Sequence, residues 1–192
     1  NLVKYYLNGS QFHVKVIDGS GNPIVNTNVS MNINGVFYVR QTNSEGIATL
    51  NIKLWSGKYI LTVHNPYDGL LKSFDVTVLP TIESNDLVKY YHNDSQFYAK
   101  FVDGAGNPLV NTKVKFNING VLYTRETNGE GVAKLNINLN PGEYILTSIH
   151  PNGLQVGKKV TVLPTLEGSD LTMNYKDGSQ FKARLVDGTG RA

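Results

Sequence analysis

Apolar and polar side chains alternate along most of the chain with a period of two residues. In the segment that follows Ser10, Phe12, Val14 and Val16 share one face, while His13 and Lys15 lie on the other. This period is typical of half-buried β-strands, in which successive side chains point to opposite faces. No window has the spacing of three to four residues that marks an amphipathic helix. The chain is therefore predicted to be all-β.

Turn signals divide the first part of the chain into short strands. Asn34-Gly35 is a strong signal for a two-residue hairpin, and other turns rich in Gly, Asn and Pro follow at short intervals. This spacing is typical of an antiparallel β-sandwich. Seven strands are expected in the first unit, at residues 2–7, 11–18, 29–33, 36–40, 48–54, 59–63 and 74–79.

The whole pattern is repeated. The stretch Asp18–Thr27 (DGSGNPIVNT) recurs 85 residues later as Asp103–Thr112 (DGAGNPLVNT), and a third copy begins at Asp187 and stops at Ala192. Self-similarity at a fixed period is the signature of a repeat architecture. We expect one repeat at residues 1–80, a second at 81–165 with a linker at 80–86, and the linker and first two strands of a truncated third repeat at 166–192.

The junctions and the third copy lead to further expectations. Both junctions, Leu79–Asp86 and Leu163–Asp170, are short and contain Pro, so we expect semi-rigid extended connectors. Two strands do not make an independently stable unit. The third copy is therefore expected to pack on the preceding domain, to pair with strands of another chain, or to belong to a longer array.

A tyrosine in a late strand adds a more specific feature. Tyr59 follows Leu54 and Gly57 in the first unit, and Tyr144 follows Leu139 and Gly142 in the second. A tyrosine just after such a corner can donate a hydrogen bond back to the preceding connection, as in Greek-key sandwiches. We expect a tyrosine corner in each unit.

Composition and charge exclude several classes of function. The formal net charge of +3 is small and the lysines are scattered, which argues against a nucleic-acid partner. The absence of cysteine excludes disulfides and Cys-ligated metal. No apolar run is long enough to span a membrane. Asn1 is not part of a signal peptide, so a mature or excised piece of a longer protein is expected.

The order of these motifs resembles a known family of repeats. The segments that carry the resemblance are Phe12–Pro23, Asn34–Tyr38, Thr42–Gly46 and Gly57–Leu61. They resemble Ig-like repeats of invasin/intimin-type and CnaB-type surface domains, and above all the tandem repeats of large adhesin-like surface proteins of methanogenic archaea. The resemblance implies tandem Ig-like β-sandwiches in a non-enzymatic stalk or adhesin module, exported and displayed on the cell surface.

The residues themselves indicate no active site. His13, His64, His92 and His150 occupy four non-equivalent positions in the repeats, whereas a site built once per unit needs them to coincide. No Ser or Thr lies in a nucleophile elbow, and no Gly-rich loop carries the Lys and Ser/Thr of a phosphate site. We expect each histidine to face solvent, and we predict no enzymatic activity and no cofactor.

The CnaB resemblance raises the hypothesis of a self-formed isopeptide bond between a buried Lys and an Asn. Lys15 alternates out of phase with the apolar face, and Arg184 and Met173 stand at the matching lysine positions of the third copy. The closing strand also lacks an Asn, so we expect no such bond. The residues considered are the lysines Lys4, Lys15, Lys89 and Lys100 and the asparagines Asn32, Asn51, Asn117 and Asn136.

Metal and glycan sites give weaker signals. The Asp18 loop resembles half of a calcium loop, but Val29 stands where the bidentate Glu belongs. Carboxylates near the junctions are an alternative calcium site, although solvated linker acids are the expectation favoured. These carboxylates are Glu83, Asp86, Asp103, Glu167, Asp170 and Asp187; the glycosylation sequons begin at Asn8, Asn28 and Asn93.

Exposed aromatic residues are the remaining binding candidates. One ring each of Tyr5-Tyr6 and Tyr90-Tyr91 is expected to be exposed, and Trp55 is expected at a loop tip. Exposed rings can stack on sugars or on a protein partner. The second unit has Asn140 in place of Trp55, so no shared aromatic site is expected.

Together with the repeats, the resemblance implies an extracellular structural module, the repeated stalk of an adhesin or filament. Its expected partners are neighbouring repeats of the same or identical chains. One alternative is direct binding of a glycan or protein by loops around Trp55, Asn65–Gly69 and Pro151–Gly153. A second alternative is polymerisation by strand exchange through the partial third repeat.

Overall fold

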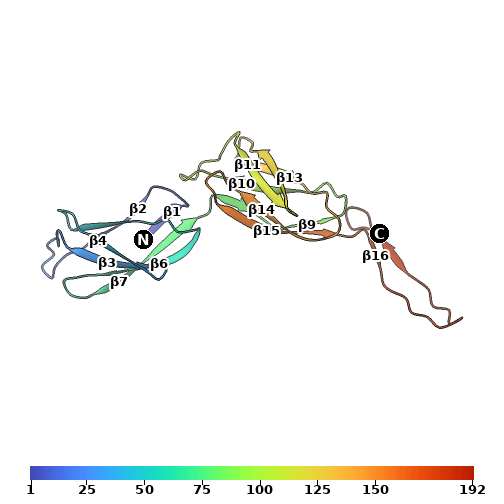
Figure 1. The fold of residues 1–192 in the computed structure, drawn as a ribbon, viewed down its shortest axis with the longest axis horizontal. Coiled ribbons are helices and arrows are strands. Elements are labelled where there is room, and N and C mark those ends of the chain that lie inside the picture. Colours follow the sequence, from blue (N-terminus) through green and yellow to red (C-terminus); the bar gives the residue numbers. More distant parts are fainter. The chain divides into compact units, whose positions relative to one another are not determined.

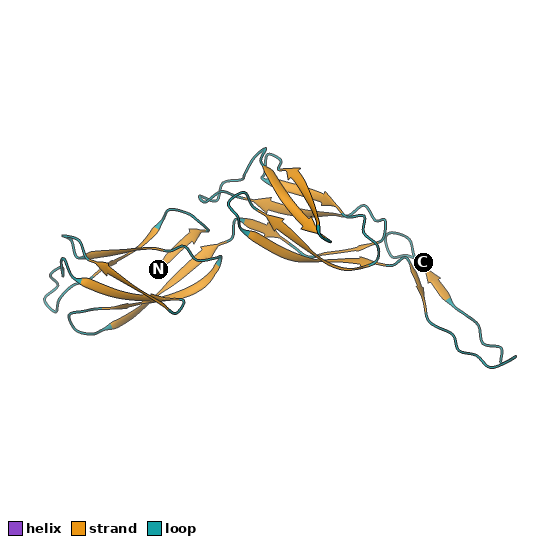
Figure 2. Cartoon of the chain, in the orientation of Figure 1, coloured by secondary structure: helices purple, strands orange, loops and turns teal.

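The computed structural model describes all residues from Asn1 to Ala192. It contains 17 strands and no helix (Figure 2). No segment therefore forms a helix long and apolar enough to cross a membrane. The all-β prediction is confirmed.

The chain divides into two compact units. The first comprises Asn1–Thr81 together with Val102–Asn107, and the second comprises Ile82–Phe101 together with Pro108–Ala192. The turn Val102–Asn107 therefore belongs to the first unit, although it lies in the second sequence repeat.

The first unit is a two-layer sandwich (Figure 1). A five-stranded sheet has the order β1-β7-β6-β3-β4, and the second layer is the two-stranded sheet β2-β5. All neighbouring strands are antiparallel except β1 and β7, which are parallel. The strands are β1 (Leu2–Tyr5), β2 (Gln11–Lys15), β3 (Asn28–Ile33), β4 (Val36–Gln41), β5 (Ile47–Asn51), β6 (Gly57–His64) and β7 (Leu71–Leu79).

The second unit repeats this topology with one added strand. Its sheets have the orders β12-β11-β14-β15-β9 and β13-β10-β8. A separate two-stranded sheet, β16-β17, lies near the end of the chain. The strands are β8 (Ile82–Ser84), β9 (Leu87–Tyr90), β10 (Gln96–Phe101), β11 (Lys113–Ile118), β12 (Val121–Glu126), β13 (Val132–Asn136), β14 (Gly142–Ile149), β15 (Gln155–Leu163), β16 (Leu166–Gly168) and β17 (Ala183–Leu185).

The alternating apolar residues fill the space between the two layers of each unit. Their burial removes apolar surface from water and is the main stabilising term of such a sandwich. Edge-to-face ring pairs join Phe116 to Phe97 and to Phe101 in the second core. Core residues include Phe12, Val29, Met31, Leu50, Leu61 and Val76 in the first unit, and Phe97, Phe101, Phe116, Leu135, Leu146 and Val160 in the second.

The predicted turns and corners form. Asn34 and Gly35 have φ angles of 53° and 76°. Positive φ at both central residues defines the turn that matches the twist of a two-residue hairpin. Tyr59 Oη donates to the carbonyl of Trp55 at 2.9 Å, and Tyr144 Oη donates to that of Asn140 at 2.8 Å. The tyrosine corners are thus confirmed in both units.

The two junctions differ from expectation. Ile82–Ser84 is not a free connector, because it forms β8 and pairs with β10; Leu166–Gly168 likewise forms β16 and pairs with β17. For β8 the reason is an edge effect: without it one side of β10 would be unpaired, and an extended segment next to such an edge gains main-chain hydrogen bonds by pairing with it.

The third copy also differs from expectation. After Asp170 it contains one strand, β17, instead of two, because the segment that matches β1 does not pair. The strand that β17 pairs with is the junction strand β16. Apolar side chains of this copy stay exposed, among them Phe181 at 64% and Leu185 at 70%.

Candidate functional site

Each unit buries one lysine side chain. Lys4 and Lys89 occupy matching positions in β1 and β9 and are only 4% and 3% exposed. Lys4 Nζ donates to the carbonyls of Ser10 at 2.8 Å and Ile52 at 3.1 Å. Lys89 Nζ donates in the same way to Ser95 at 3.1 Å and Ile137 at 2.9 Å. The ammonium group thus joins the first strand to the loop that follows it and to the end of β5 or β13.

Burial lowers the pKa of both lysines, because the charged form loses solvation. Near Lys89, the negative charge of Asp94 acts in the opposite direction. A buried lysine with a lowered pKa has the character that an isopeptide-forming lysine needs. The groups around each lysine decide whether it can form an isopeptide bond or serves as a hydrogen-bond donor.

Each buried lysine has a valine as its register partner in the adjacent strand. Lys4 lies opposite Val78 in the parallel pair β1–β7, and Lys89 lies opposite Val162 in β9–β15. Both groups are engaged by main-chain carbonyls instead. Lys15 and Lys100 are exposed and pair with Ile47 and Val132. Among the asparagines, Asn51 and Asn136 are exposed, while Asn32 and Asn117 are half-buried opposite Phe37 and Leu122.

The Asp-Gly-x-Gly turn is held by its own carboxylate. Asp18 Oδ1 accepts from the amides of Ser20 at 2.8 Å and Asn22 at 2.9 Å, and Asp103 does the same with Ala105 and Asn107 at 2.8 Å. These hydrogen bonds favour the charged form and lower the pKa of both carboxyl groups, the amides of Asn22 and Asn107 contributing most.

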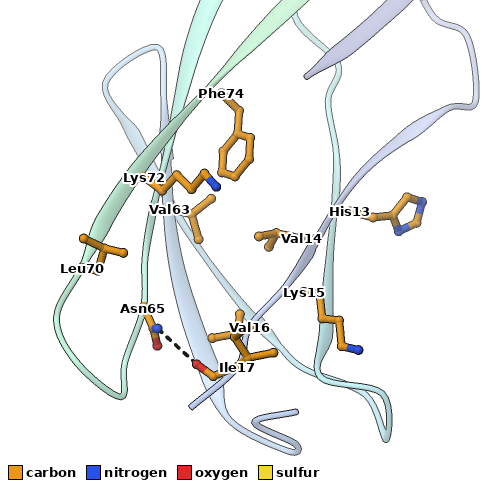
Figure 3. Close-up of a pocket in the computed structure, with 10 residues that line it drawn as sticks. All are labelled: His13, Val14, Lys15, Val16, Ile17, Val63, Asn65, Leu70, Lys72 and Phe74. Carbon is orange, nitrogen blue, oxygen red and sulfur yellow. Dashed lines mark hydrogen bonds between the residues drawn. The ribbon is translucent and has the colours of Figure 1, made fainter. Parts of the chain in front are cut away.

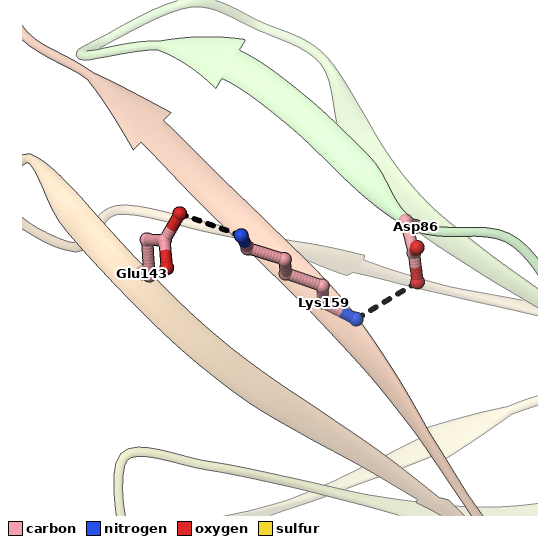
Figure 4. A network of polar contacts seen from close by, with 3 residues as sticks. All are labelled: Asp86, Glu143 and Lys159. Carbon is pink, nitrogen blue, oxygen red and sulfur yellow. Dashed lines mark hydrogen bonds and ion pairs between the residues drawn. The ribbon is translucent and has the colours of Figure 1, made fainter.

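The junction carboxylates have separate structural partners. Asp86 Oδ1 accepts from the main-chain amide of Lys159 at 2.9 Å, while Lys159 Nζ forms an ion pair with Glu143 at 2.6 Å (Figure 4). Glu167 forms an ion pair with Arg184 at 3.6 Å. The structure has no group of three or more His, Asp or Glu side chains that could hold a metal ion.

A Tyr-x-x-Asn segment receives an Asp-Gly-x-Gly turn in each unit. In the first unit, Asn8 Nδ2 donates to the carbonyl of Gly104, and a Cβ on Gly106 would lie 2.6 Å from the Tyr5 ring. In the second, Asn93 Nδ2 donates to Gly188 O, and a Cβ on Gly190 would lie 2.6 Å from the Tyr90 ring. Glycine is required at both turns because any side chain would overlap the ring.

These contacts bear on the sequons and on the tyrosine pairs. Asn8 and Asn93 are half-buried with their amides engaged, whereas Asn28 is exposed.

The expectation that one ring of each tyrosine pair is exposed is wrong. Tyr5, Tyr90 and Tyr91 are half-buried and Tyr6 is buried, because turns and neighbouring rings cover them.

Trp55 is a partly covered aromatic at the predicted loop. It is 59% exposed, and its ring stacks on Tyr6 with centroids 5.0 Å apart. Asn65–Gly69 and Pro151–Gly153 form turns that are mostly exposed. Trp55 and these turns remain the residues through which a direct binding function would act.

The histidines have four different surroundings. His13 Nδ1 lies 2.9 Å from Thr49 Oγ1, His64 is exposed, and His92 is exposed with its ring against Tyr91. The expectation that every histidine faces solvent is wrong for His150, which is 6% exposed. Its Nδ1 accepts from the amide of Asn152 at 3.0 Å and so closes a turn.

The most distinctive feature of the first unit is an open strand edge beside an apolar pocket (Figure 3). β2 has β5 as its only neighbour, whereas the matching strand β10 lies between β13 and β8. The pocket has a volume of about 410 Å³. It lies along this open edge and is lined by His13, Val14, Lys15, Val16, Ile17, Val63, Asn65, Leu70, Lys72 and Phe74. Sequence reasoning missed this pocket, because side chains from segments far apart in the sequence line it.

Comparison with known proteins does not assign a family. No family model matches the chain, and no curated protein matches it. Among solved structures, the chain is similar to SGBP-B of the Bacteroides ovatus mixed-linkage glucan utilization locus, in complex with a mixed-linkage heptasaccharide. The identity is 14%, the match covers 93% of this chain and 50% of that one, and the TM-score is 0.29.

Two further structures have a similar degree of likeness. The fibronectin(III)-like modules of Clostridium thermocellum CbhA are 11% identical over 85% of this chain and 90% of theirs, with a TM-score of 0.28. Tandem Ig domains of titin are 12% identical over 85% of this chain and 92% of theirs, with a TM-score of 0.30. With scores this low, the assignment to Ig-like sandwiches rests on the strand topology described above.

Proposed function

We propose that the chain is a non-enzymatic structural module, the repeated stalk of an extracellular adhesin or filament of the kind found in archaeal adhesin-like proteins. The observation that carries this proposal is the duplication of supporting contacts. The buried lysine, the tyrosine corner, the Asp-Gly-x-Gly turn and the Tyr-x-x-Asn contact occur at matching positions of both sequence repeats. The repeated features are thus contacts that stabilise the fold.

The exposed features that could bind a ligand are not repeated in this way. Trp55 has Asn140 as its counterpart, and the turn Asn65–Gly69 is one residue longer than the matching turn His150–Gly153. A spacer needs each unit to keep its fold, while its loops are free to vary. This difference supports a structural role over a binding site built once per unit.

A stalk module should bear force and bind no ligand of its own. When the chain is stretched between two handles, we expect two unfolding events, one for each unit. About 80 residues at ~3.5 Å per residue have an extended length of roughly 28 nm, so each event should lengthen the chain by that amount less the length of the folded unit. On glycan arrays and intact cells, the immobilised chain should give no signal above that of a heat-denatured sample. Saturable binding that Trp55→Ala removes would instead support the direct binding module.

A further inference from the structure

We propose that the solvent-facing side of the sheet β1-β7-β6-β3-β4, here called the first face, binds the equivalent side of β12-β11-β14-β15-β9, the second face, of another copy of the chain. In this contact Lys58 faces Glu143 and Asp75 faces Lys159. The inference rests on the proposed structural function, since it names a partner of the repeat module, but a different measurement tests it.

Both faces carry exposed apolar side chains at matching positions. Antiparallel sheets that cover a core on one side usually present polar side chains to water on the other. Here three apolar side chains on that other side are more than half exposed in each unit. Exposed apolar side chains that share one face mark surfaces that bind another protein. They are Val3, Phe37 and Ile60 on the first face, and Val88, Leu122 and Ile145 on the second.

The charges of the two faces are exchanged. On the first face, β6 supplies Lys58 and β7 supplies Asp75. On the second, β14 supplies Glu143 and β15 supplies Lys159. The strand registers put Lys58 and Glu143 at one matching position, and Asp75 and Lys159 at another. When equivalent positions of the two faces meet, each base therefore meets an acid, whereas two identical faces in that arrangement would bring like charges together.

The two charged pairs also differ in shape. Glu143 and Lys159 form an ion pair at 2.6 Å across their strands (Figure 4). Lys58 and Asp75 form no ion pair, and together with Ile60 they line an open hollow of about 450 Å³. The bridged side chains thus cover the second face at the place where the first face is hollow. The faces complement one another in shape as well as in charge.

The energetics of exposed charges favour a role in recognition. An exposed ion pair adds little to the stability of the unit that carries it. Complementary charges on two surfaces select the partner and fix the register of a contact, while the surrounding apolar side chains supply the area removed from water. The contact joins two different surfaces. Each chain therefore has one face for each of two neighbours, and such a heterologous contact lets an assembly grow.

Sedimentation velocity of the full chain over a range of concentrations tests the proposal. We expect concentration-dependent oligomers. Lys58→Glu/Asp75→Lys exchanges the charges of the first face and leaves the net charge unchanged. Both faces then have acid and base at the same positions, so association should weaken at least about tenfold. Ile60→Ser, at an exposed position of the same face, should also weaken association.

A second exchange restores the complementary charges. The quadruple variant Lys58→Glu/Asp75→Lys/Glu143→Lys/Lys159→Glu reverses both faces together and should associate like the original chain. Glu45→Lys/Lys53→Glu exchanges two exposed charges that lie outside the first face, and is the matched control. It should leave association unchanged. Circular dichroism of each variant verifies that the fold is retained.

Three results would overturn the proposal. The first is a chain that stays monomeric at all concentrations. The second is association that survives Lys58→Glu/Asp75→Lys, as a pairing of two first faces or a contact elsewhere would. The third is a folded quadruple variant that does not regain association. The stretching and glycan experiments use single or immobilised chains and do not depend on this association, so the two proposals fail separately.

Discussion

Lys4 and Lys89 donate hydrogen bonds to main-chain carbonyls. Each satisfies two carbonyls from segments that strand pairing leaves without a neighbour. A buried ammonium group is costly to desolvate. Its presence in both units therefore indicates that its hydrogen bonds to the backbone stabilise the fold. The sequence does not predict this burial, because a lone lysine in Leu-Val-Lys-Tyr is expected on the solvent-facing side of a strand.

Replacement of the buried lysine of the second unit tests this role. We expect Lys89→Met to lower the free energy of unfolding of that unit by about 1.5–3 kcal/mol, the range for hydrogen bonds that involve a charged group. The methionine fills similar space but cannot donate to Ser95 and Ile137. Urea denaturation followed by circular dichroism measures the change. Lys100→Met, at an exposed position, is the control and should shift stability by no more than about 0.5 kcal/mol; equal effects of the two variants would contradict the assignment.

The Asp-Gly-x-Gly turns predict a loss of stability in acid. Hydrogen bonds lower the pKa of Asp18 and Asp103 in the folded state below the ordinary value of 3.8. The unfolded chain therefore takes up protons first, and the stabilisation present above that value is lost as the pH falls through the lowered folded pKa. Urea midpoints at pH 7, 4 and 2.5 should show this fall. It should be smaller in Asp18→Asn/Asp103→Asn; an identical acid dependence in the double variant would exclude these turns as its source.

The junction strands β8 and β16 are the elements that the sequence did not predict. Alternation and turn signals located the seven strands of the first unit, because strands such as β3 bury alternate side chains and Asn34-Gly35 marks the hairpin to β4. β8 has three residues, follows Pro80, and buries one aliphatic side chain, so it has no periodic pattern. Its pairing is set by the open edge of β10, which only the folded sheet reveals.

Truncation of Ile82 measures what the junction strand contributes. We expect Ile82→Ala to destabilise the second unit by about 2–5 kcal/mol, the range for loss of a large buried aliphatic side chain. Thermal unfolding should show a lower midpoint for that unit and an unchanged midpoint for the first. Val88→Ala removes a side chain that is 63% exposed and should have little effect. If Ile82 behaved like Val88, β8 would be a connector and not part of the core.

At the scale of the whole chain, equivalent sequences form two units whose cores differ in composition. The second has a strand on each side of β10 and carries Phe101 and Phe116 where the first has Val16 and Met31. The first has an open edge and exposes Leu70. The repeat and its sandwich fold follow from the sequence, but the pairing of β8 with β10 does not, because it depends on which segments the folded sheet brings together.

The larger aromatic side chains in the core of the second unit predict two thermal transitions, of which the first unit gives the lower. Differential scanning calorimetry at low protein concentration should resolve them. Leu61 and Leu146 are matching, fully buried core residues. Leu61→Ala should lower only the first transition and Leu146→Ala only the second, so the pair assigns each peak. A single transition that both variants shift together would contradict independent units.

The placement of β8 determines where along the sequence each structural repeat begins. The strand that completes a sandwich is encoded ahead of the segment that begins with Leu87, next to the last strand of the preceding copy. An array that gains or loses copies by recombination therefore keeps complete sandwiches only if each crossover carries the Pro-Thr-Ile-Glu segment along with the copy that follows it. A crossover after this segment would leave one sandwich with an unpaired strand edge. Arrays that change their number of repeats are therefore expected to be joined ahead of the Pro-Thr-Ile-Glu segment.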